Sequence, residues 1–442
     1  MALSGRKHDG HQYIEEATKR GAIAVLGEKD PAELDEAPTT YIQVDNSRKA
    51  LSEISDLFFE KPTENLYSVG VTGTNGKTTT AHLAYQILGS QNTELISTLS
   101  SLLRTGVKGP VTTPEAPPIH RQAFRAREEG KQNLVMETSS HALSFSRVDH
   151  VRFDCGVFTN LSRDHLDYHQ SMRDYQNAKL RLFRSIPEKG WVVLNADEPF
   201  ESDIRAVVNA NILTYGIREE ADVQATVQEC DNHRSKFIVS YGGNQEVVET
   251  ELFGRFNIYN SLAAYAVGLV AGISRVNIHS RLESAESVPG RMETLSLPSG
   301  GDVVIDFAHN PGALGKVLDL LSEHYRRVLV VFGCGGESDK GKRPAMGEVA
   351  ERSASYSYLT NDNPKGEDPH AILRDIAEGF TCEDSYEIIP QRKEAIKKGA
   401  ERLEPGEVLL IAGKGHESYQ IIGDKWIEYN DKQFVKEELS AS

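Results

Sequence analysis

The residue types best suited to chemistry lie in one glycine-rich stretch, residues 67–80, which reads Y-S-V-G-V-T-G-T-N-G-K-T-T-T. Glycines in such a turn let backbone N–H groups approach phosphate oxygens. A lysine supplies positive charge, and a threonine hydroxyl can ligate the metal ion that accompanies ATP. An apolar run precedes the turn and a helical pattern follows it, which favours this function over a turn that binds nothing. The predicted ATP-binding residues are Gly73, Thr74, Asn75, Gly76, Lys77, Thr78 and Thr79.

Further polar residues follow later apolar runs. Glu137 ends the run N-L-V-M-E-T, His165 lies in T-N-L-S-R-D-H-L-D-Y-H, and Lys179 comes fourteen residues after His165. A carboxylate at the end of a strand beside the phosphate-loop strand is placed to bind magnesium, although a glutamate in this position is ordinarily only solvated. A lone histidine with a lone lysine does not by itself indicate a function.

Strands that alternate with helices must position these residues. Between residues 66 and 291 the runs S-V-G-V-T, N-L-V-M-E-T, D-C-G-V-F-T-N and W-V-V-L-N alternate with helical patterns, which predicts a parallel sheet covered by helices. Residues 222–252 predict a hairpin that turns at Gly242, Gly243 and Asn244. After V-P-G-R-M-E, five more runs predict a second doubly wound unit, whose ligands should lie at the carboxyl ends of its strands. These runs are D-V-V-I-D-F-A, R-V-L-V-V-F-G, Y-S-Y-L-T, Y-E-I-I-P and E-V-L-L-I-A-G.

Residues 1–65 predict a small α/β unit. A helical pattern ends at Gly21, the strand candidates A-I-A-V-L-G and T-Y-I-Q-V follow, and a helix is predicted around residues 48–59. The chain of 442 residues is too long for one ordinary domain. The predicted domains are therefore 1–65 at the amino terminus, 66–291 in the centre, which binds ATP, and 292–442 at the carboxyl terminus.

Composition limits the classes of partner. The net charge of −16 argues against a nucleic-acid ligand, because a duplex binder needs a concentrated basic face. No apolar run is long enough to span a bilayer or to form a signal peptide, so we expect no membrane partner and a cytoplasmic location. The four cysteines form no C-x-x-C pair, which predicts reduced thiols rather than disulfides or a zinc site.

The motifs taken together resemble those of the Mur ligase family. The common P-loop has a glycine where this chain has Val71, and the form T-G-T-N-G-K-T-T is that of Mur ligases and folylpolyglutamate synthetases. The chain is similar specifically to the tripeptide synthetases, the MurE type, which join UDP-N-acetylmuramoyl-L-alanyl-D-glutamate to diaminopimelate or lysine in peptidoglycan synthesis. The other motifs of this resemblance are G-R-F-N-I-Y-N, V-P-G-R-M-E, D-F-A-H-N-P, G-C-G-G-E-S-D-K-G-K-R-P, D-N-P-K and A-G-K-G-H-E-S-Y-Q.

The resemblance implies a three-domain α/β architecture: a truncated N-terminal domain for the UDP-linked substrate, a central P-loop domain with a parallel sheet, and a C-terminal Rossmann-like domain for the amino acid. It also implies a two-step reaction, in which ATP phosphorylates a carboxylate and an amine attacks the acyl phosphate. The implied catalytic residues are Lys77, Glu137, His165 and Lys179. The resemblance implies two magnesium ions, whose ligands are Thr78, Glu137, His165 and a carbamylated Lys179, with His165 on the second ion.

The same resemblance assigns the substrate contacts. Two asparagines approach the adenine, an arginine binds phosphate, an aspartate binds ribose, and a histidine lies beside them. These residues are Asn257, Asn260, Arg291, Asp306 and His309. The implied acceptor residues are Thr112, Thr113, Ser139 and Arg147. The implied amino-acid residues are Ser338, Asp362, Asn363, Pro364, Lys365, Gly413 and Glu417.

Departures from the family pattern fall on the substrate side. Family members carry some tens of residues before S-G-R-K-H-D-G-H, including a D-S-R strand that contacts uridine. We therefore expect either that the start of this sequence is misplaced or shortened, or that the uridine site is incomplete. Phe145 stands where the family has a glutamine, and it cannot make an amide's hydrogen bonds. Diaminopimelate-adding members have arginines where this chain has Ser338 and Lys365, and the loss of both planar groups removes bidentate recognition of carboxylates.

Three functions stay open at this point. The first is peptidoglycan tripeptide synthesis by a monomer that acts on small molecules, with the added amino acid undetermined. The second is a related ligase that joins a different carboxylate and amine in a specialised pathway. The third, a catalytically idle partner of a true ligase, is disfavoured because Lys77, Glu137, His165 and Lys179 are all present. A ligase of this fold must close its third domain on the nucleotide, which predicts movement about residues 288–294.

Overall fold

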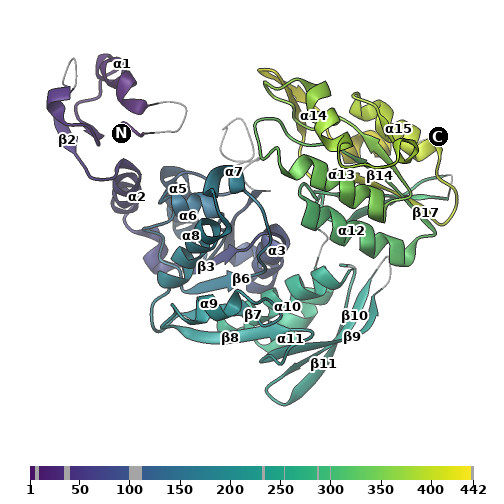
Figure 1. Cartoon of the computed structure of the whole chain (residues 1–442). Coiled ribbons are helices and arrows are strands. Elements are labelled where there is room, and N and C mark those ends of the chain that lie inside the picture. The colour runs from purple at the N-terminus through teal and green to yellow at the C-terminus, as the bar shows by residue number, and fades with distance from the viewer. Residues whose placement is uncertain are drawn as a thin grey trace.

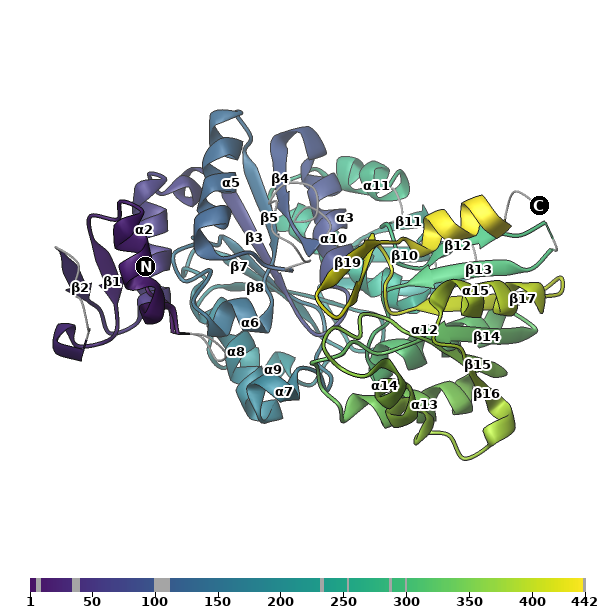
Figure 2. The ribbon, with the colours of Figure 1, turned by 90° about the horizontal axis from the view of Figure 1, so that it is seen from above.

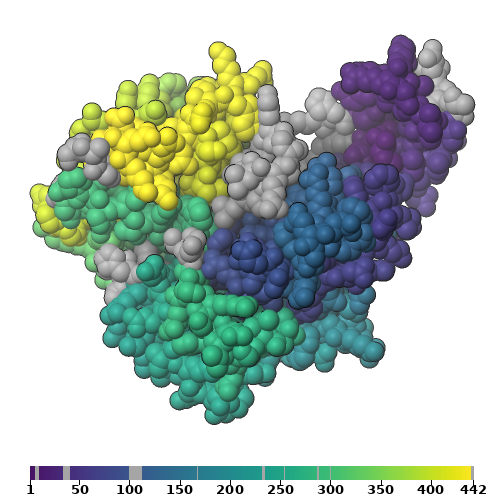
Figure 3. Space-filling model, turned by 180° about the vertical axis from the view of Figure 1, so that it is seen from behind, coloured from purple at the N-terminus to yellow at the C-terminus, as the bar shows by residue number. Residues whose placement is uncertain are grey.

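The chain folds into three units that follow one another from the amino to the carboxyl terminus. The structure, a computed structural model, describes residues 1–4, 9–33, 40–98, 112–230, 234–252, 254–285, 288–298 and 300–439, so part of the motif S-G-R-K-H-D-G-H lies outside the described residues. Figure 2 shows the N-terminal unit at one end, the central unit in the middle and the C-terminal unit at the other end. Seen from behind in Figure 3, the first and last units lie on opposite sides of the central one.

The central unit is built on a mixed sheet, which has nine strands among the described residues, in the order β11-β10-β9-β8-β7-β6-β3-β5-β4 (Figure 1). Neighbours from β4 to β9 are parallel, and β9, β10 and β11 form an antiparallel meander. The bounds are β3 (Tyr67–Thr72), β4 (Thr93–Ile96), β5 (Asn133–Glu137), β6 (Cys155–Phe158), β7 (Trp191–Asn195), β8 (Asn211–Gly216), β9 (Val223–Cys230), β10 (Ser235–Tyr241) and β11 (Asn244–Thr250).

Helices cover both faces of this sheet, which explains why its central strands are almost continuously apolar. On one face Val69 packs with Ala84 and Leu262 of α3 and α10, and on the other Leu182 of α8 packs with residues of α5 and α6. The bounds are α3 (Lys77–Leu88), α5 (Ala116–Glu128), α6 (Ser140–Ser144), α7 (Leu166–His169), α8 (Met172–Arg184), α9 (Glu201–Arg205), α10 (Arg255–Val270) and α11 (Arg275–Glu283).

The C-terminal unit is a second helix-covered sheet, with the order β12-β13-β17-β14-β15-β16. All its neighbours are parallel except β12, which lies antiparallel at the edge. The bounds are β12 (Glu293–Ser296), β13 (Asp302–Asp306), β14 (Arg327–Phe332), β15 (Tyr356–Leu359), β16 (Tyr386–Ile388), β17 (Glu407–Ala412), α12 (Pro311–His324), α13 (Lys342–Ser353), α14 (Pro369–Ala377), α15 (Arg392–Glu401) and α16 (Asp431–Phe434). A separate antiparallel hairpin joins β18 (Tyr419–Ile422) to β19 (Lys425–Glu428).

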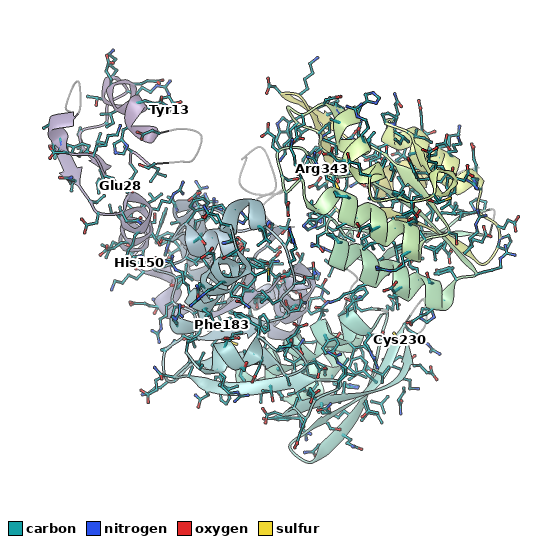
Figure 4. All side chains as sticks on the ribbon, in the orientation of Figure 1. Tyr13, Glu28, His150, Phe183, Cys230 and Arg343 are labelled. Atoms are coloured by element: carbon teal, nitrogen blue, oxygen red, sulfur yellow. The ribbon has the colours of Figure 1, made fainter. Side chains whose placement is uncertain are left out.

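The N-terminal unit contains α1 (Ile14–Lys19), the parallel strands β1 (Val25–Gly27) and β2 (Tyr41–Gln43), and α2 (Ser47–Phe58). Figure 1 shows that α2 joins this unit to the central one. The backbone N–H of His150 donates to Ser52 Oγ of α2 at 3.3 Å, and Figure 4 shows His150 beside this junction. The N–H of Arg152 donates to Thr63 Oγ1 at 3.1 Å, so backbone hydrogen bonds fix the end of the first unit to the second.

The strands predicted from apolar runs are all present, and the hairpin turn at Gly242 and Gly243 lies between β10 and β11 as predicted. The prediction omitted β4, β8, β12 and the β18–β19 hairpin. The strands β4, β12, β18 and β19 have four residues each, and β4 and β12 lie at sheet edges, where strands carry fewer apolar residues than buried central strands. In contrast, β8 is an internal strand of six residues. No helix among the described residues is long and apolar enough to cross a lipid bilayer, and all four cysteines are free.

Candidate functional site

A cavity of about 470 Å³ lies where the central sheet's strand ends face the C-terminal unit. The parallel strands β3, β5 and β6 are neighbours, so the segments that follow them meet at one edge of the sheet. All the predicted ATP, catalytic and acceptor residues line this cavity. They are Gly73, Thr74, Asn75, Gly76, Lys77, Thr78, Thr79, Thr112, Thr113, Glu137, Ser139, Arg147, His165, Lys179, Asn257, Asn260, Arg291, Asp306 and His309.

The phosphate loop connects β3 to α3, and two of its glycines have no room for a side chain. A Cβ atom on Gly73 would lie 1.8 Å from Thr159 Oγ1, and one on Gly76 would lie 2.4 Å from Asn260 Oδ1. Gly76 also has a φ of 81°, a left-handed backbone conformation that favours glycine. Lys77 Nζ donates to the carbonyls of Gly73 and Thr74 at 3.0 and 2.7 Å, so its positive charge is held over the loop.

Glu137 ends β5 and is fully buried beside the loop. Its carboxylate accepts hydrogen bonds from Thr78 Oγ1 at 3.0 Å and from the N–H of Thr98 at 2.9 Å. Burial raises the pKa of this carboxyl, while hydrogen bonding to Thr98 and the positive charges of Lys77 and Arg291 lower it. Arg291 approaches from the far side, where its Nη2 donates to Thr78 Oγ1 at 3.1 Å. The Glu137 carboxylate and the Thr78 hydroxyl therefore form one polar cluster with the cations Lys77 and Arg291.

His165 and Lys179 lie on the other side of the phosphate loop. His165 directly precedes α7, and burial lowers the pKa of its ring to about 3, so the ring is neutral and can act as a ligand. Lys179 lies in α8 and is buried, and its Nζ donates to Gly73 O at 2.7 Å and is 4.3 Å from the centre of the Tyr175 ring. Burial and the neighbouring charge of Lys77 hold the pKa of Lys179 well below its usual range.

The donor atoms suit a magnesium ion that is only partly held by protein. Magnesium prefers oxygen ligands and is often bound by one or two protein groups together with substrate phosphates. The Glu137 carboxylate and the Thr78 hydroxyl are such oxygens, 3.0 Å apart. Among the described residues, no three or more histidine, cysteine, aspartate or glutamate side chains form a group that could hold a metal ion. Phosphate oxygens would therefore have to supply further ligands.

The nucleotide side of the cavity combines α10 with the start of the C-terminal unit. Asn260 Nδ2 donates to Asn257 Oδ1 at 3.0 Å, so the two predicted adenine contacts are hydrogen-bonded to each other. The Arg291 guanidinium lies 4.5 Å from the centre of the Phe307 ring, a stacking partner that the sequence analysis did not identify. Its only sequence cue was its place inside the D-F-A-H-N-P motif. Phe307 orients the arginine toward Thr78.

The predicted acceptor residues are hydrogen-bonded to Glu137 through Thr113. Thr113 Oγ1 donates to the backbone carbonyl of Glu137 at 2.8 Å and accepts from the N–H of Ser139 at 3.0 Å. Arg147 Nη1 donates to Thr113 O at 2.9 Å, and its Nη2 pairs with Glu115 at 2.8 Å. The predicted acceptor residues Thr113, Ser139 and Arg147 therefore lie at the same strand end as the predicted metal ligand Glu137.

The predicted amino-acid residues gather elsewhere in the C-terminal unit and do not line this cavity. Asn363 Nδ2 and Lys414 Nζ both donate to Glu417 Oε2, at 2.9 and 2.8 Å. Lys414 is completely buried and was missed by the sequence analysis, although it lies within the G-K-G-H-E motif. The loop with Ser338 packs on the loop with Pro364, since a Cβ on Gly336 would lie 1.9 Å from Pro364 O.

A buried arginine anchors these two loops. Arg343 Nη2 donates to Glu367 Oε2 at 2.9 Å, and Nη1 donates to Asp375 Oδ2 at 2.7 Å. Glu367 also accepts from the N–H of Glu337, next to Ser338. Figure 4 shows Arg343 inside the C-terminal unit. Its buried charge pairs hold the Ser338 loop in place, a role that the sequence analysis did not assign.

Comparison with known proteins shows the family. Three family models match successive parts of the chain: the Mur ligase family catalytic domain at residues 1–59, the Mur ligase middle domain at 71–268 and the Mur ligase glutamate ligase domain at 290–415. A protein of Geobacillus thermodenitrificans is 40% identical, and the match covers 99% of this chain and 91% of that protein. The chain belongs to the Mur ligase family.

The names and structures of similar Mur ligases agree with this placement. The Geobacillus thermodenitrificans protein and one from Bacillus velezensis, 40% identical over 98% of this chain and 89% of that protein, are both called UDP-N-acetylmuramoyl-L-alanyl-D-glutamate–2,6-diaminopimelate ligase. A solved structure of a ligase with this name is 30% identical, with a TM-score of 0.64, and the match covers 97% of this chain and 88% of that one. The predicted three-domain α/β architecture with a parallel-sheet central domain is confirmed, and so is the predicted class, an ATP-dependent ADP-forming ligase.

The packing around Gly76 generates a prediction for this Mur ligase. We expect Gly76→Ala to weaken ATP binding by about tenfold or more, because an added Cβ strains a left-handed backbone and meets Asn260 Oδ1 at 2.4 Å. Isothermal titration calorimetry with ATP measures this. Gly130→Ala is the matched control, since Gly130 has a φ of 76° but open space around it. Equal ATP affinities of Gly76→Ala and the wild type would contradict the prediction.

Proposed function

We propose that this Mur ligase phosphorylates the free side-chain carboxylate of UDP-N-acetylmuramoyl-L-alanyl-D-glutamate and joins it to the amino group of diaminopimelate, in peptidoglycan synthesis. One observation carries the proposal: the phosphate loop and the acceptor residues Thr113 and Arg147 meet at Glu137 in one cavity. The names of relatives 40% identical over nearly the whole chain supply the substrates.

Phosphoryl transfer requires charge neutralisation, because both the carboxylate and the triphosphate are negative. Lys77 lies over the loop, and Arg291 reaches Thr78 from the opposite wall, so two cations flank the transferring group. Magnesium held through Thr78, Glu137 and His165 would further neutralise the phosphate oxygens. Asn257 and Asn260 take the adenine, with Asp306 and His309 near the ribose and phosphates.

Lys179 is proposed to carry a carbamate that helps to hold the metal. Its amine is buried in the cavity wall, where an ammonium group has one carbonyl acceptor, Gly73 O, and a positive neighbour, Lys77. The neutral amine would add carbon dioxide and release a proton, which forms a carbamate and places an anion, in place of a buried cation, opposite Lys77. The change would add a carboxylate-like oxygen ligand beside His165 for a second magnesium ion.

The amino-acid residues must approach the cavity for the second step. Asp362, Asn363, Pro364, Lys365, Gly413, Glu417 and Ser338 all belong to the C-terminal unit and lie outside the cavity. We infer that this unit closes by movement about residues 288–294. Gly290 lies in this segment and packs tightly on the loop that contains Gly413 and Glu417, since a Cβ on it would lie 2.0 Å from His416 N. Closure would therefore move the loop with Gly413 and Glu417 toward the cavity together with Arg291.

A second candidate is a ligase of the same mechanism that uses another carboxylate and amine. It is favoured by Ser338 and Lys365, which cannot grip carboxylates bidentately as two arginines would. Lys365 has a φ of 52° and its N–H donates to Ile421 O, so its backbone is fixed against the β18–β19 hairpin. Its side chain therefore presents a point charge from a fixed position.

The reaction itself is tested by phosphate release from ATP. We expect release when UDP-N-acetylmuramoyl-L-alanyl-D-glutamate and diaminopimelate are both present, and little with either alone. Lysine, ornithine and acidic amino acids form the comparison panel. Release that needs a different carboxylate, with none from the muramoyl dipeptide and any amino acid, would overturn the proposal and support the second candidate.

The carbamate is tested with Lys179→Ala. We expect kcat to fall by about 100-fold or more, because a preorganised group at the phosphoryl-transfer site is lost, and to recover in part with short-chain carboxylic acids. Steady-state phosphate release measures both effects. Lys189→Ala, at an exposed lysine, serves as the control. Full activity of Lys179→Ala without any added acid would rule out the carbamate.

The amino-acid pocket is tested with the double variant Ser338→Arg with Lys365→Arg. Two planar donors should restore bidentate contacts and lower the KM for diaminopimelate by about tenfold. Lys340→Arg is the matched control, because Lys340 lies on the same loop and pairs with Glu367 at 3.7 Å. An unchanged KM in the double variant would show that these two positions do not limit recognition.

A further inference from the structure

Two arginines from different units of the chain approach the ring of Phe145. Arg48 comes from α2 of the N-terminal unit, and its Cζ lies 4.3 Å from the ring centre. Arg147 belongs to the central unit and lines the cavity, and its Cζ lies 5.5 Å from the same ring. Both distances are within the range of cation–π attraction, about 6 Å. Phe145 is thus a common platform for two guanidinium groups.

The charges around this platform do not balance. Glu115 Oε1 pairs with Arg147 Nη2 at 2.8 Å and lies 3.6 Å from Arg48 Nη1, so one carboxylate serves two cations. The Arg48 and Arg147 side chains are only 21% and 16% exposed. Burial lowers the pKa of Arg147, Glu115 raises it, and the charge of Arg48 lowers it. A second anion would relieve this excess of positive charge.

The two guanidinium groups also have buried donors without acceptors. Arg48 Nη1 and Arg147 Nε are shielded from solvent and have no hydrogen-bond partner among the described residues. A buried N–H of a charged group without a partner is costly. A guanidinium group that stacks on a ring keeps its N–H edge free for a planar or tetrahedral oxyanion. Stacking on Phe145 therefore leaves N–H donors of both arginines available to a ligand.

The position of this group indicates which ligand it meets. Arg147 Nη1 donates to Thr113 O, and Thr113 in turn is hydrogen-bonded to Glu137 at the phosphoryl-transfer site. Arg48 lies on the side of the N-terminal unit. A ligand that contacts both arginines thus extends from the reacting carboxylate toward the first unit. The proposed acceptor carries two kinds of oxyanion that such a group could bind, a peptide carboxylate and a diphosphate.

We propose that Arg48 and Arg147, held on Phe145 and paired with Glu115, form a two-arginine clamp that binds an oxyanion of the acceptor substrate. The inference rests on the proposed function, because it names a further binding residue, Arg48, at the same acceptor site. It also assigns Phe145 a role, because the ring orients both arginines. Stacking on this ring would replace the hydrogen bonds that the family's glutamine makes at this position.

The clamp is tested by calorimetric binding of UDP-N-acetylmuramoyl-L-alanyl-D-glutamate and by steady-state kinetics. We expect Arg48→Ala to raise the acceptor Kd and KM by about tenfold to 100-fold and to leave the KM for ATP unchanged. Arg48→Lys keeps a charge but not the planar fork and should recover part of the loss. Phe145→Leu should raise the acceptor Kd about threefold to tenfold, because the platform is lost.

Arg127→Ala is the matched control. Arg127 is also 21% exposed, stacks on a ring at 4.8 Å and pairs with a glutamate, but its partners are Phe124 and Glu60 rather than the ring and the carboxylate that Arg48 shares with Arg147. We expect its acceptor Kd to equal that of the wild type. If Arg127→Ala and Arg48→Ala raise the acceptor Kd equally, the clamp is overturned, because the weaker binding then reflects a general loss of folding stability.

A second ligand identifies the oxyanion. If Arg48→Ala weakens binding of N-acetylmuramoyl-L-alanyl-D-glutamate, which has no nucleotide, the clamp holds a carboxylate; if it weakens only the UDP-linked acceptor, the clamp holds the diphosphate. If the wild type binds the acceptor but does not ligate it, the proposed function is contradicted. The clamp is still tested in that case, because the acceptor Kd of the wild type can be compared with that of Arg48→Ala. An unchanged acceptor Kd in Arg48→Ala, or no binding of this acceptor to the wild type, would overturn the clamp.

Discussion

The burial of one carboxylate, that of Glu137, determines how the rest of the site is arranged. Its side chain accepts hydrogen bonds from Thr78 and Thr98, and its backbone carbonyl accepts one from Thr113. A buried carboxylate needs such partners because it is separated from water. The residues that satisfy it come from the nucleotide helix, the segment after β4 and the acceptor loop. One electrostatic requirement thus holds together the parts that must meet for phosphoryl transfer.

The same requirement explains the concentration of positive charge around the cavity. Lys77, Lys179 and Arg291 lie around the phosphate loop, and the cavity wall also contains the buried carboxylates of Glu137, Asp164 and Asp306. In the proposed reaction, a triphosphate and a carboxylate substrate would add further negative charge beside these cations. Because burial makes each cation costly when it is alone, the protein binds best when anions complete the site.

The three units divide recognition between them. The central sheet presents the loop, the proposed metal ligands and the acceptor threonines at one edge. The C-terminal unit brings Arg291 and Phe307 to the cavity, where they are proposed to meet the nucleotide, and its proposed amino-acid residues lie outside the cavity. The N-terminal unit contributes Arg48 through α2. Departures from the family pattern fall on substrate positions, whereas the groups around the phosphates are retained.

The sequence by itself determined features that depend on neighbouring residues. These include the phosphate loop at 73–79, whose glycines and lysine act within one turn, and the buried strands, whose apolar runs require helices on both faces. Only the tertiary structure decided which distant side chains meet. Lys179 reaches Gly73 across 106 positions, and Arg48 reaches Phe145 from another unit. Sheet order and the packing of units set such contacts, and these depend on the whole chain rather than on local spacing.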